Sequence, residues 1–560
     1  MSTALGQKAN PQLNSGDSRR ASSGRWILNS WLDLLLFVST PLLIVPLVLL
    51  IQAPWFGVEI ATISVIVSTF GGLGHHLPGM IRAYGDRDLF KRFRMRFILA
   101  PLFLLAVCIP LSQYHLNAML LILSVWGCWH ALMQVYGFVR IYDARVGCVS
   151  SVTAWWDWLM CLSWFSTAQI FSNGKMSRLL EYWYTSGGPL IPPSYVHTFR
   201  GVCLAVSVLV LVGFLVNYGV QTSRGQKPNS VKLLMLASSI GFWWFAMVLV
   251  EDIILGIALF EIFHDVQYLT IVWLYNCRTA SSNPDIGKFM RFVFRRGRGM
   301  LMLYIGLVFA YGTIGMFSLE IEGDSFANLI RGVVWASTIL HFYYDGFIWK
   351  VRDKATRAGL GLDMGKSQPV SKSIAIGEFA HLLKWSPLII ILSWLSITEL
   401  SGSSFPPGGN AARSWPNQTQ LERVQNIAVA IPDDLRAQRR AATTLANMGR
   451  DDEAIRNLKS VLQRHPSYLA GQHLLGEIYR KRGEFDQERL CYETAITHAK
   501  GSSDQTLSHH RMGEFFMFQK NYQAARTHFR EALKHDSTFE PSRSAISTMN
   551  RLGDGLPHKN

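Results

Sequence analysis

Charged residues are scarce in this 560-residue chain. Asp, Glu, Lys and Arg make up 16% of it and apolar residues 49%, whereas ordinary globular proteins contain about a quarter charged residues. The scarcity ends near Leu400: long apolar runs fill the chain before it, and a polar segment follows. This division excludes a disordered tail and a single soluble globule. We expect a membrane protein with a soluble appendage.

Paired cysteines and a compact basic face are also absent. The seven cysteines form no C-x-x-C pair, which argues against a zinc ribbon, a thioredoxin-type motif and a disulfide-built fold. The net charge is +16, but Lys and Arg fall in short stretches between apolar runs. A membrane protein has this distribution, so we expect no nucleic-acid partner.

The apolar runs have the length of transmembrane helices, which need roughly 20 residues to cross a bilayer. They predict about eleven spans, near 26–52, 55–73, 97–112, 116–138, 152–172, 200–218, 231–250, 253–275, 300–318, 328–349 and 374–398. Residues 1–25 form a polar tail, and we interpret the first span as a retained anchor, not a cleaved signal peptide. Residues 26–400 are therefore expected to form an all-α transmembrane bundle.

The loops between these spans differ in charge. Alternate loops and the N-terminal tail hold about 27 Lys and Arg residues, and the other loops hold about three. Because basic loops stay on the cytoplasmic side, we place the N-terminus in the cytoplasm of a cell with an inner membrane. An odd number of spans then puts the segment after Leu400 outside the cytoplasm.

Histidines and their polar neighbours recur inside the predicted spans, where ionisable groups are costly and mark functional sites by default. The expected metal ligands are His75, His76, His130, His264 and His341. The residues expected to support them are Gln134, Glu261, Asp265, Gln267, Asp345, Glu378 and His381. Counted from the predicted cytoplasmic boundaries, the histidines share a depth of about two to four helical turns.

Spacing along the helices strengthens this interpretation. His130 with Gln134, His341 with Asp345, and Glu261 with His264 each lie three or four residues apart and so share a helix face. A metal-bound imidazole commonly hydrogen-bonds such a partner through its second nitrogen. Histidine with carboxylate favours iron, and less distinctively zinc or manganese.

Structural interpretations stay open for these residues. A single buried histidine is more often a hydrogen-bonded structural residue than a ligand, and His75, His76, Glu378 and His381 stand near span ends, where they could face lipid headgroups. The same groups could also relay protons. Asp33 and Asp157 begin predicted helices, where a carboxylate favours the helix dipole, and we interpret both as structural.

The histidine arrangement is similar in organisation to the bacterial membrane dioxygenases that cleave β-carotene, which distribute single histidines over several spans. No motif is shared, and no residue roles are carried over. The H-x-x-x-H and H-x-x-H-H boxes of membrane desaturases and hydroxylases are absent from this chain.

A period of about 34 residues follows the turn-rich linker 401–420. Small and large residues recur at Ala442, Leu445, Gly449, Ala454, Leu458, Val461 and Pro466, then at Gly476, Tyr479, Gly483, Tyr492 and Ala495, then at Gly513, Phe516, Tyr522, Ala525, Phe529 and Ala532. This pattern over 435–539 resembles the tetratricopeptide repeat family, with departures at Glu488, Lys500 and Ser537. The resemblance implies an α-solenoid over 421–556, ended by capping helices, whose groove binds a peptide or protein.

Two functions are compatible with these observations. The first is a metal-dependent membrane oxidoreductase, similar to an oxygenase or desaturase, that acts on a lipid or isoprenoid substrate and recruits a partner through its repeats. The second is a transporter or envelope-assembly scaffold without enzymatic activity. A lipid-linked sugar transferase is disfavoured, because the first predicted outer loop offers only Glu59 as a carboxylate.

Overall fold

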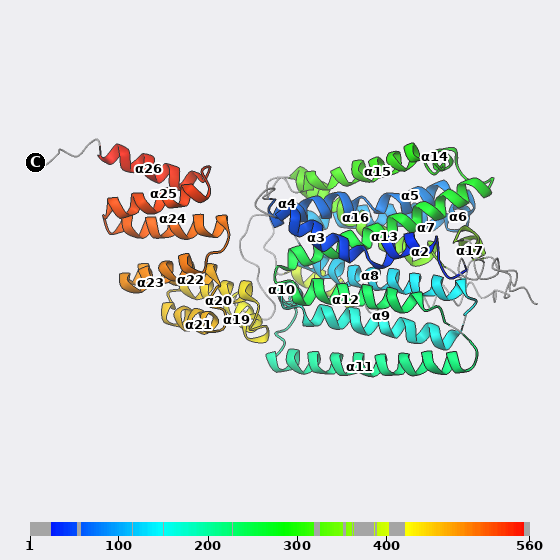
Figure 1. Ribbon diagram of the computed structural model, residues 1–560, viewed down its shortest axis with the longest axis horizontal. Coiled ribbons are helices and arrows are strands. Elements are labelled where there is room, and N and C mark those ends of the chain that lie inside the picture. The colour runs from blue at the N-terminus through cyan, green and yellow to red at the C-terminus, as the bar shows by residue number, and fades with distance from the viewer. Residues whose placement is uncertain are drawn as a thin grey trace, which may run out of the picture. The chain divides into compact units, whose positions relative to one another are not determined.

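The computed structural model describes residues 24–52, 58–114, 116–148, 150–226, 228–318, 325–350, 354–360, 362, 386, 389–391, 393–401 and 420–553. Throughout these residues the secondary structure is helical, apart from an isolated bridge between Asp86 and Ile286 (Figure 1). The chain divides into two compact units: Met1–Gly188 with Thr198–Trp415, and Pro189–His197 with Pro416–Asn560.

Long helices run side by side through the first unit (Figure 1). In chain order the elements up to Leu360 are α2 (Ser30–Asp33), η1 (Leu34–Val38), α3 (Thr40–Gln52), α4 (Ile60–Ile66), η2 (Val67–Leu73), α5 (His76–Gly85), α6 (Arg87–Arg92), α7 (Arg94–Gln113), α8 (Asn117–Arg145), α9 (Ser151–Phe171), α10 (Asn173–Thr185), α11 (Pro193–Ser223), α12 (Val231–Trp244), η3 (Phe245–Leu249), α13 (Ile253–Ser282), α14 (Lys288–Val293), α15 (Arg298–Gly312), η4 (Thr313–Ser318), α16 (Ser325–Ile348) and α17 (Lys354–Leu360).

Seven helices in the described residues are long and apolar enough to cross a membrane, or eight if α2–η1 and α3, which meet at 52°, form one span. Helices α9 and α16 have 21 and 24 residues but do not meet the same criterion of length and composition. The span predicted near 374–398 lies mostly outside the described residues. The number of about eleven spans therefore stays a prediction.

Exposed apolar surface supports the assignment to a membrane. The most apolar stretch of α11 is only 11% buried, and Leu209, Leu215 and Val216 are each more than half exposed. Water disfavours continuous apolar surface of this kind, whereas lipid chains are a suitable solvent for it.

Helix α13 lies at the centre of the first unit, because it contacts α3, α4, η2, α5, η3 and α17. The π-helical segment η2 approaches it closely at Gly71, where an added Cβ atom would collide with the Asp265 carboxylate. Such π-helical turns often occur at functional sites. The second predicted span ended too early, at residue 73: a helix continues to Gly85, so His75 and His76 lie inside the bundle and not at a span end.

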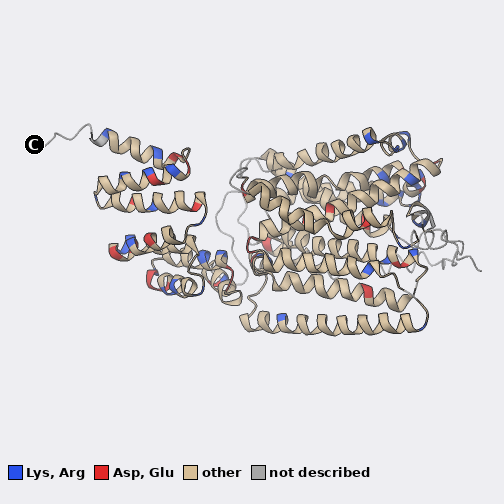
Figure 2. Ribbon diagram, viewed as in Figure 1, with Lys and Arg blue, Asp and Glu red and all other residues tan. Residues whose placement is uncertain are grey.

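Lys and Arg residues gather at one end of the first unit, around α6, α14 and α17 (Figure 2). They include Arg87, Lys91 and Arg92 of α6 and Lys288 and Arg291 of α14. The positive-inside pattern seen in the sequence is thus also an asymmetry between the two ends of the bundle.

The second unit is a row of antiparallel helices (Figure 1). The helices are α19 (Gln420–Ala430), α20 (Leu435–Asn447), α21 (Asp451–Arg464), α22 (Leu469–Arg482), α23 (Phe485–His498), α24 (Ser502–Phe518), α25 (Tyr522–His535) and α26 (Glu540–Gly553). Each helix contacts the next one in the chain, and α22 also contacts α20 and α24. Each therefore packs mainly on its sequence neighbours, as a solenoid requires.

Small residues let these helices cross closely. A Cβ atom added at Gly476 or Gly513 would lie 2.6 Å from the ring of Tyr492 or Phe529. Glu488 occupies a position where the repeat pattern has a small residue, and its buried carboxylate accepts a hydrogen bond from Arg480 Nε at 2.5 Å. An ion pair thus compensates for the departure from the pattern.

Candidate metal centre

Five imidazoles meet inside the first unit. His75 and His76 lie where η2 passes into α5, and the other three rings come from α8, α13 and α16. Each residue is no more than 8% exposed, and six pairs of these rings have centroids 4.5–5.3 Å apart. Residues that are up to 266 positions apart in the sequence therefore share one buried site.

The nitrogen atoms are close enough to bind one ion. His341 Nε2 lies 3.1 Å from His75 Nε2 and 3.1 Å from His130 Nε2. Two nitrogens bound to one metal at about 2.1 Å, with an angle between a right angle and tetrahedral, would be roughly 3 Å apart. Three overlapping groups have all their ligand atoms within 4.8 Å of one another: His75 with His130 and His264, His75 with His76 and His341, and His130 with His341 and Asp345.

Hydrogen bonding between neutral rings does not satisfy these contacts. His75 Nδ1 faces only acceptors, since it donates to the Gly71 carbonyl at 3.0 Å and lies 2.8 Å from Asp265 Oδ1. A neutral His75 therefore carries a lone pair on Nε2. One proton on His341 Nε2 can lie along only one of its two 3.1 Å contacts, so the other contact lacks an aligned hydrogen bond. A cation between the rings would satisfy all three nitrogens.

Two carboxylates border the imidazoles. Asp345 Oδ1 accepts hydrogen bonds from Tyr268 at 3.1 Å and from Trp349 Nε1 at 2.9 Å, and its Oδ2 lies 3.8 Å from His341 Nε2. Asp265 Oδ1 contacts His75 and has no hydrogen-bond partner within the described chain. Asp265 therefore places a buried negative charge beside the rings.

The remaining predicted residues have other positions. Gln134 Nε2 donates to the backbone of His264 at 3.0 Å and to Gln267 at 3.2 Å, and Gln267 in turn donates to the Phe37 carbonyl at 2.8 Å. These amides connect helices, and the buried Gln134 Oε1 atom has no hydrogen-bond partner among the described residues. Glu261 belongs to none of the three ligand groups. Glu378 and His381 lie outside the described residues.

Sequence reasoning missed several contacts of the cluster. His76 Nδ1 pairs with Ser337 Oγ at 3.0 Å, and Tyr311 lies 2.8 Å from the same hydroxyl. Ser337 stands one helical turn before His341, and Trp349 one turn after Asp345, so the four-residue spacing could have identified both. Tyr311 comes from another helix, and no local signal pointed to it.

Asp33 and Asp157 are structural, as expected, but specific partners hold them in addition to any helix dipole. Asp33 accepts from the backbone nitrogens of Ile27 and Leu28 and from Tyr142. Asp157 pairs with Lys232 at 3.0 Å and with Arg140 at 2.7 Å. These buried ion pairs fix α8, α9 and α12 to one another.

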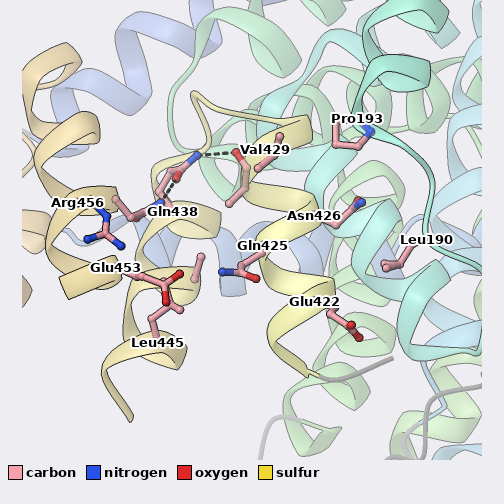
Figure 3. Close-up of a pocket in the computed structure, with 13 residues that line it drawn as sticks. Leu190, Pro193, Glu422, Gln425, Asn426, Val429, Gln438, Leu445, Glu453 and Arg456 are labelled. Atoms are coloured by element: carbon pink, nitrogen blue, oxygen red, sulfur yellow. Dashed lines mark hydrogen bonds between the residues drawn. The ribbon is translucent and has the colours of Figure 1, made fainter. Parts of the chain in front are cut away.

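The second unit has a pocket of about 570 Å³ with a mixed polar and apolar lining, shown in Figure 3. It is lined by Leu190, Pro193, Glu422, Gln425, Asn426, Ala428, Val429, Gln438, Ala441, Leu445, Glu453, Arg456 and Asn457. Gln438 donates to the Ala428 carbonyl and accepts from Asn457. Its lining offers an adjacent acid and base, Glu453 and Arg456, to a polar chain.

Several histidines of the second unit contact one another or serine hydroxyls and do not form a cluster like that of the first unit among the described residues. His509 and His528 approach through their Nδ1 atoms at 3.1 Å, while His510 pairs with Ser542 at 3.0 Å. Burial and, to a lesser extent, the nearby Arg511 together lower the pKa of His473 to about 4. His473 contacts Ser508 at 3.2 Å. His473 is therefore a neutral part of the packed repeat interior at neutral pH.

Residues 436–468 match the model of the tetratricopeptide repeat family. They comprise nearly all of α20 and α21 and the turn that follows, so this segment is a tetratricopeptide repeat and the predicted resemblance is confirmed there. No curated protein matches the chain. No solved structure matches it either.

Proposed function

We propose that the first unit is a membrane-embedded metalloenzyme in which the imidazole cluster binds iron, and that it is an oxidoreductase acting on a lipid or isoprenoid chain. The carrying observation is that His341 Nε2 lies 3.1 Å from both His75 Nε2 and His130 Nε2, which neutral imidazoles cannot both satisfy with aligned hydrogen bonds. The tetratricopeptide repeat supports a protein partner for the second unit.

His75, His130 and His341 would supply the central nitrogen ligands, with His76 and His264 beside them. Imidazoles with nearby carboxylates suit iron, which would provide redox chemistry with molecular oxygen as the oxidant. The chain itself buries the site, so that water is excluded, and Tyr268 and Trp349 hold the Asp345 carboxylate 3.8 Å from His341 Nε2. Zinc and manganese are less favoured.

An apolar substrate agrees with the surroundings of the site. The cluster lies among helices with exposed apolar surfaces, so a hydrocarbon chain could reach it from the membrane without crossing water. The basic end of the bundle suits the anionic headgroups of the cytoplasmic leaflet. The match between the basic end and anionic headgroups supports an N-terminus in the cytoplasm and a repeat unit outside the cytoplasm.

Metal analysis of the detergent-purified protein tests the proposal. We expect near-stoichiometric iron in the wild type and its loss from a His130→Ala, His264→Ala double variant with unchanged helical circular dichroism. His197→Ala is the matched control, because His197 is exposed on α11. Iron-free wild type prepared without chelators, or a double variant with full iron, would contradict the metal site.

Activity and topology need separate measurements. Membranes incubated with ¹⁸O₂ should yield labelled lipid or isoprenoid products that the double variant does not form. Single cysteines introduced between residues 401 and 420 should react with an impermeant reagent from outside the cytoplasmic membrane. Labelling only from the cytoplasmic face would reverse the proposed orientation.

A proton-relay function in a transporter or scaffold is the second candidate. The contact between Asp265 and His75 favours it, because a buried acid 2.8 Å from an imidazole can exchange a proton with it. This function requires no metal. Liposomes that contain metal-free wild-type protein would then acidify inside when a pH gradient is applied, and liposomes with Asp265→Asn would not. This result would favour the proton relay over the enzyme.

A further inference from the structure

Arg82 of α5 is buried between the imidazole cluster and the basic end of the bundle, and no carboxylate of the described residues forms an ion pair with it. It is 2% exposed. Its Nη2 donates to the Tyr275 hydroxyl at 2.8 Å, while Nε and Nη1 have no hydrogen-bond partner. A buried cation in this state is unfavourable unless something compensates its charge.

Aromatic rings hold the guanidinium in place but do not neutralise it. The Arg82 Cζ atom lies 4.0 Å from the centroid of Tyr275 and 3.9 Å from that of Trp349. The indole of Trp349 also donates to Asp345 Oδ1, whose other oxygen faces His341. The Trp349 indole therefore lies in contact with both the Arg82 guanidinium and Asp345, a residue that borders the imidazoles.

Neighbouring polar groups also lack partners. Tyr275 is followed one turn later by Thr279, which lies on the same face of α13. The Thr279 hydroxyl and the side-chain amide of the adjacent Asn276 are buried and have no hydrogen-bond partner in the described chain. Two unpaired polar side chains of α13 thus lie close along the chain to Tyr275, the hydrogen-bond partner of Arg82.

We propose that Arg82, with Thr279, receives the phosphate or carboxylate headgroup of an amphiphile whose hydrocarbon chain reaches the imidazole cluster. This inference rests on the proposed function and specifies its substrate class. Guanidinium N–H groups bind phosphate and carboxylate strongly. Six residues of helix separate His76 from Arg82, a rise of about 9 Å, so the reacting carbon would lie about that far from the headgroup.

Isothermal titration in neutral-detergent micelles tests this inference with dodecyl phosphate, inorganic phosphate and an uncharged dodecyl ether. We expect dodecyl phosphate to bind the wild type, and Arg82→Gln to bind it about ten- to a hundredfold more weakly, because a charge-assisted hydrogen bond is lost. Arg87→Gln is the matched control, since Arg87 is exposed on α6 near the same end, and it should bind like the wild type.

Two further variants keep the test decisive if Arg82→Gln fails to fold. Arg82→Lys retains the charge but loses the guanidinium geometry, and Thr279→Val leaves the cation intact; both should weaken binding of dodecyl phosphate. Equal affinity in all variants, or equal losses in Arg82→Gln and Arg87→Gln, would overturn the inference. Inorganic phosphate binding as tightly as dodecyl phosphate would overturn the amphiphile in favour of a free anion.

Iron content measured on the same samples separates this inference from the proposed function. Arg82→Gln should retain its iron, because Arg82 contacts none of the five histidines. If Arg82→Gln contains iron and binds dodecyl phosphate as tightly as the wild type, only the headgroup site is refuted. A wild type without iron would refute the proposed function whatever the titration shows.

Discussion

The charge of Asp265 should raise the affinity of the imidazole cluster for a metal. Asp265 Oδ1 lies 2.8 Å from His75 Nδ1, on the opposite side of the ring from Nε2, which faces His341. The Nδ1 proton goes to the Gly71 carbonyl, so removal of the carboxylate leaves the tautomer unchanged. Asp265→Asn would therefore remove the charge and keep the shape of the side chain.

The magnitude follows from the position of Asp265 behind a ligand. Replacement of such a partner typically lowers metal affinity ten- to a hundredfold, which corresponds to about 1.4–2.7 kcal/mol. We expect about tenfold for Asp265→Asn. The stability of the metal-free protein should not fall, because Asp265 Oδ1 has no hydrogen-bond partner in the described chain to lose and a buried unpaired carboxylate is itself unfavourable.

Chelator-competition titration of iron(II) into metal-depleted protein measures the affinity, and thermal unfolding of the same samples measures stability. Asp285→Asn is the control, because Asp285 is exposed in the loop before α14. Unchanged affinity in Asp265→Asn would show that the Gly71 carbonyl alone fixes the ring. A large loss of metal-free stability would show that Asp265 is a structural residue instead.

Two further predictions concern stability. Lys232→Met should destabilise the first unit by about 3–5 kcal/mol, because it leaves a net negative charge between Asp143 and Asp157 in a buried cluster. Denaturant unfolding should show that stability recovers in a Lys232→Met, Asp157→Asn double variant, and that Lys288→Met on the surface has little effect. The pKa of His473 is lowered to about 4, so the unfolded chain binds more protons between about pH 6.5 and 4, and stability falls as the pH falls through that window. Hydrogen exchange of α22 in the full chain should accelerate there, and His473→Asn should flatten this dependence; an unchanged slope would contradict the assignment.

The first unit shows where sequence reasoning succeeds. An apolar run long enough to cross a bilayer is a local property, so most helices of the first unit lie where the runs predicted them. The boundary after residue 73 was wrong, because the apolar run ends there, whereas η2 and α5 pack against α13 and α15 and carry the helix past it to Gly85. Glycine here permits close approach to Asp265 and does not end the helix.

The candidate site could be predicted only in part. A shared depth and a spacing of three or four residues were enough to select the five histidines, since both follow from helix geometry. The roles of Gln134 and Gln267 were not predictable, because an amide on the correct helix face can bond to a backbone carbonyl as readily as to an imidazole. Arg82 looked like one more basic residue of a cytoplasmic loop.

The sequence by itself determined the all-helical class of this protein: apolar runs predict long apolar helices and the repeat period predicts a helical repeat region, because both patterns are properties of neighbouring residues. Only the tertiary structure decided which side chains meet. The rotation of each helix about its axis depends on packing against helices distant in the chain. That rotation brings His75 and His130 each within 3.1 Å of His341 and leaves Arg82 buried without an ion pair among the described residues.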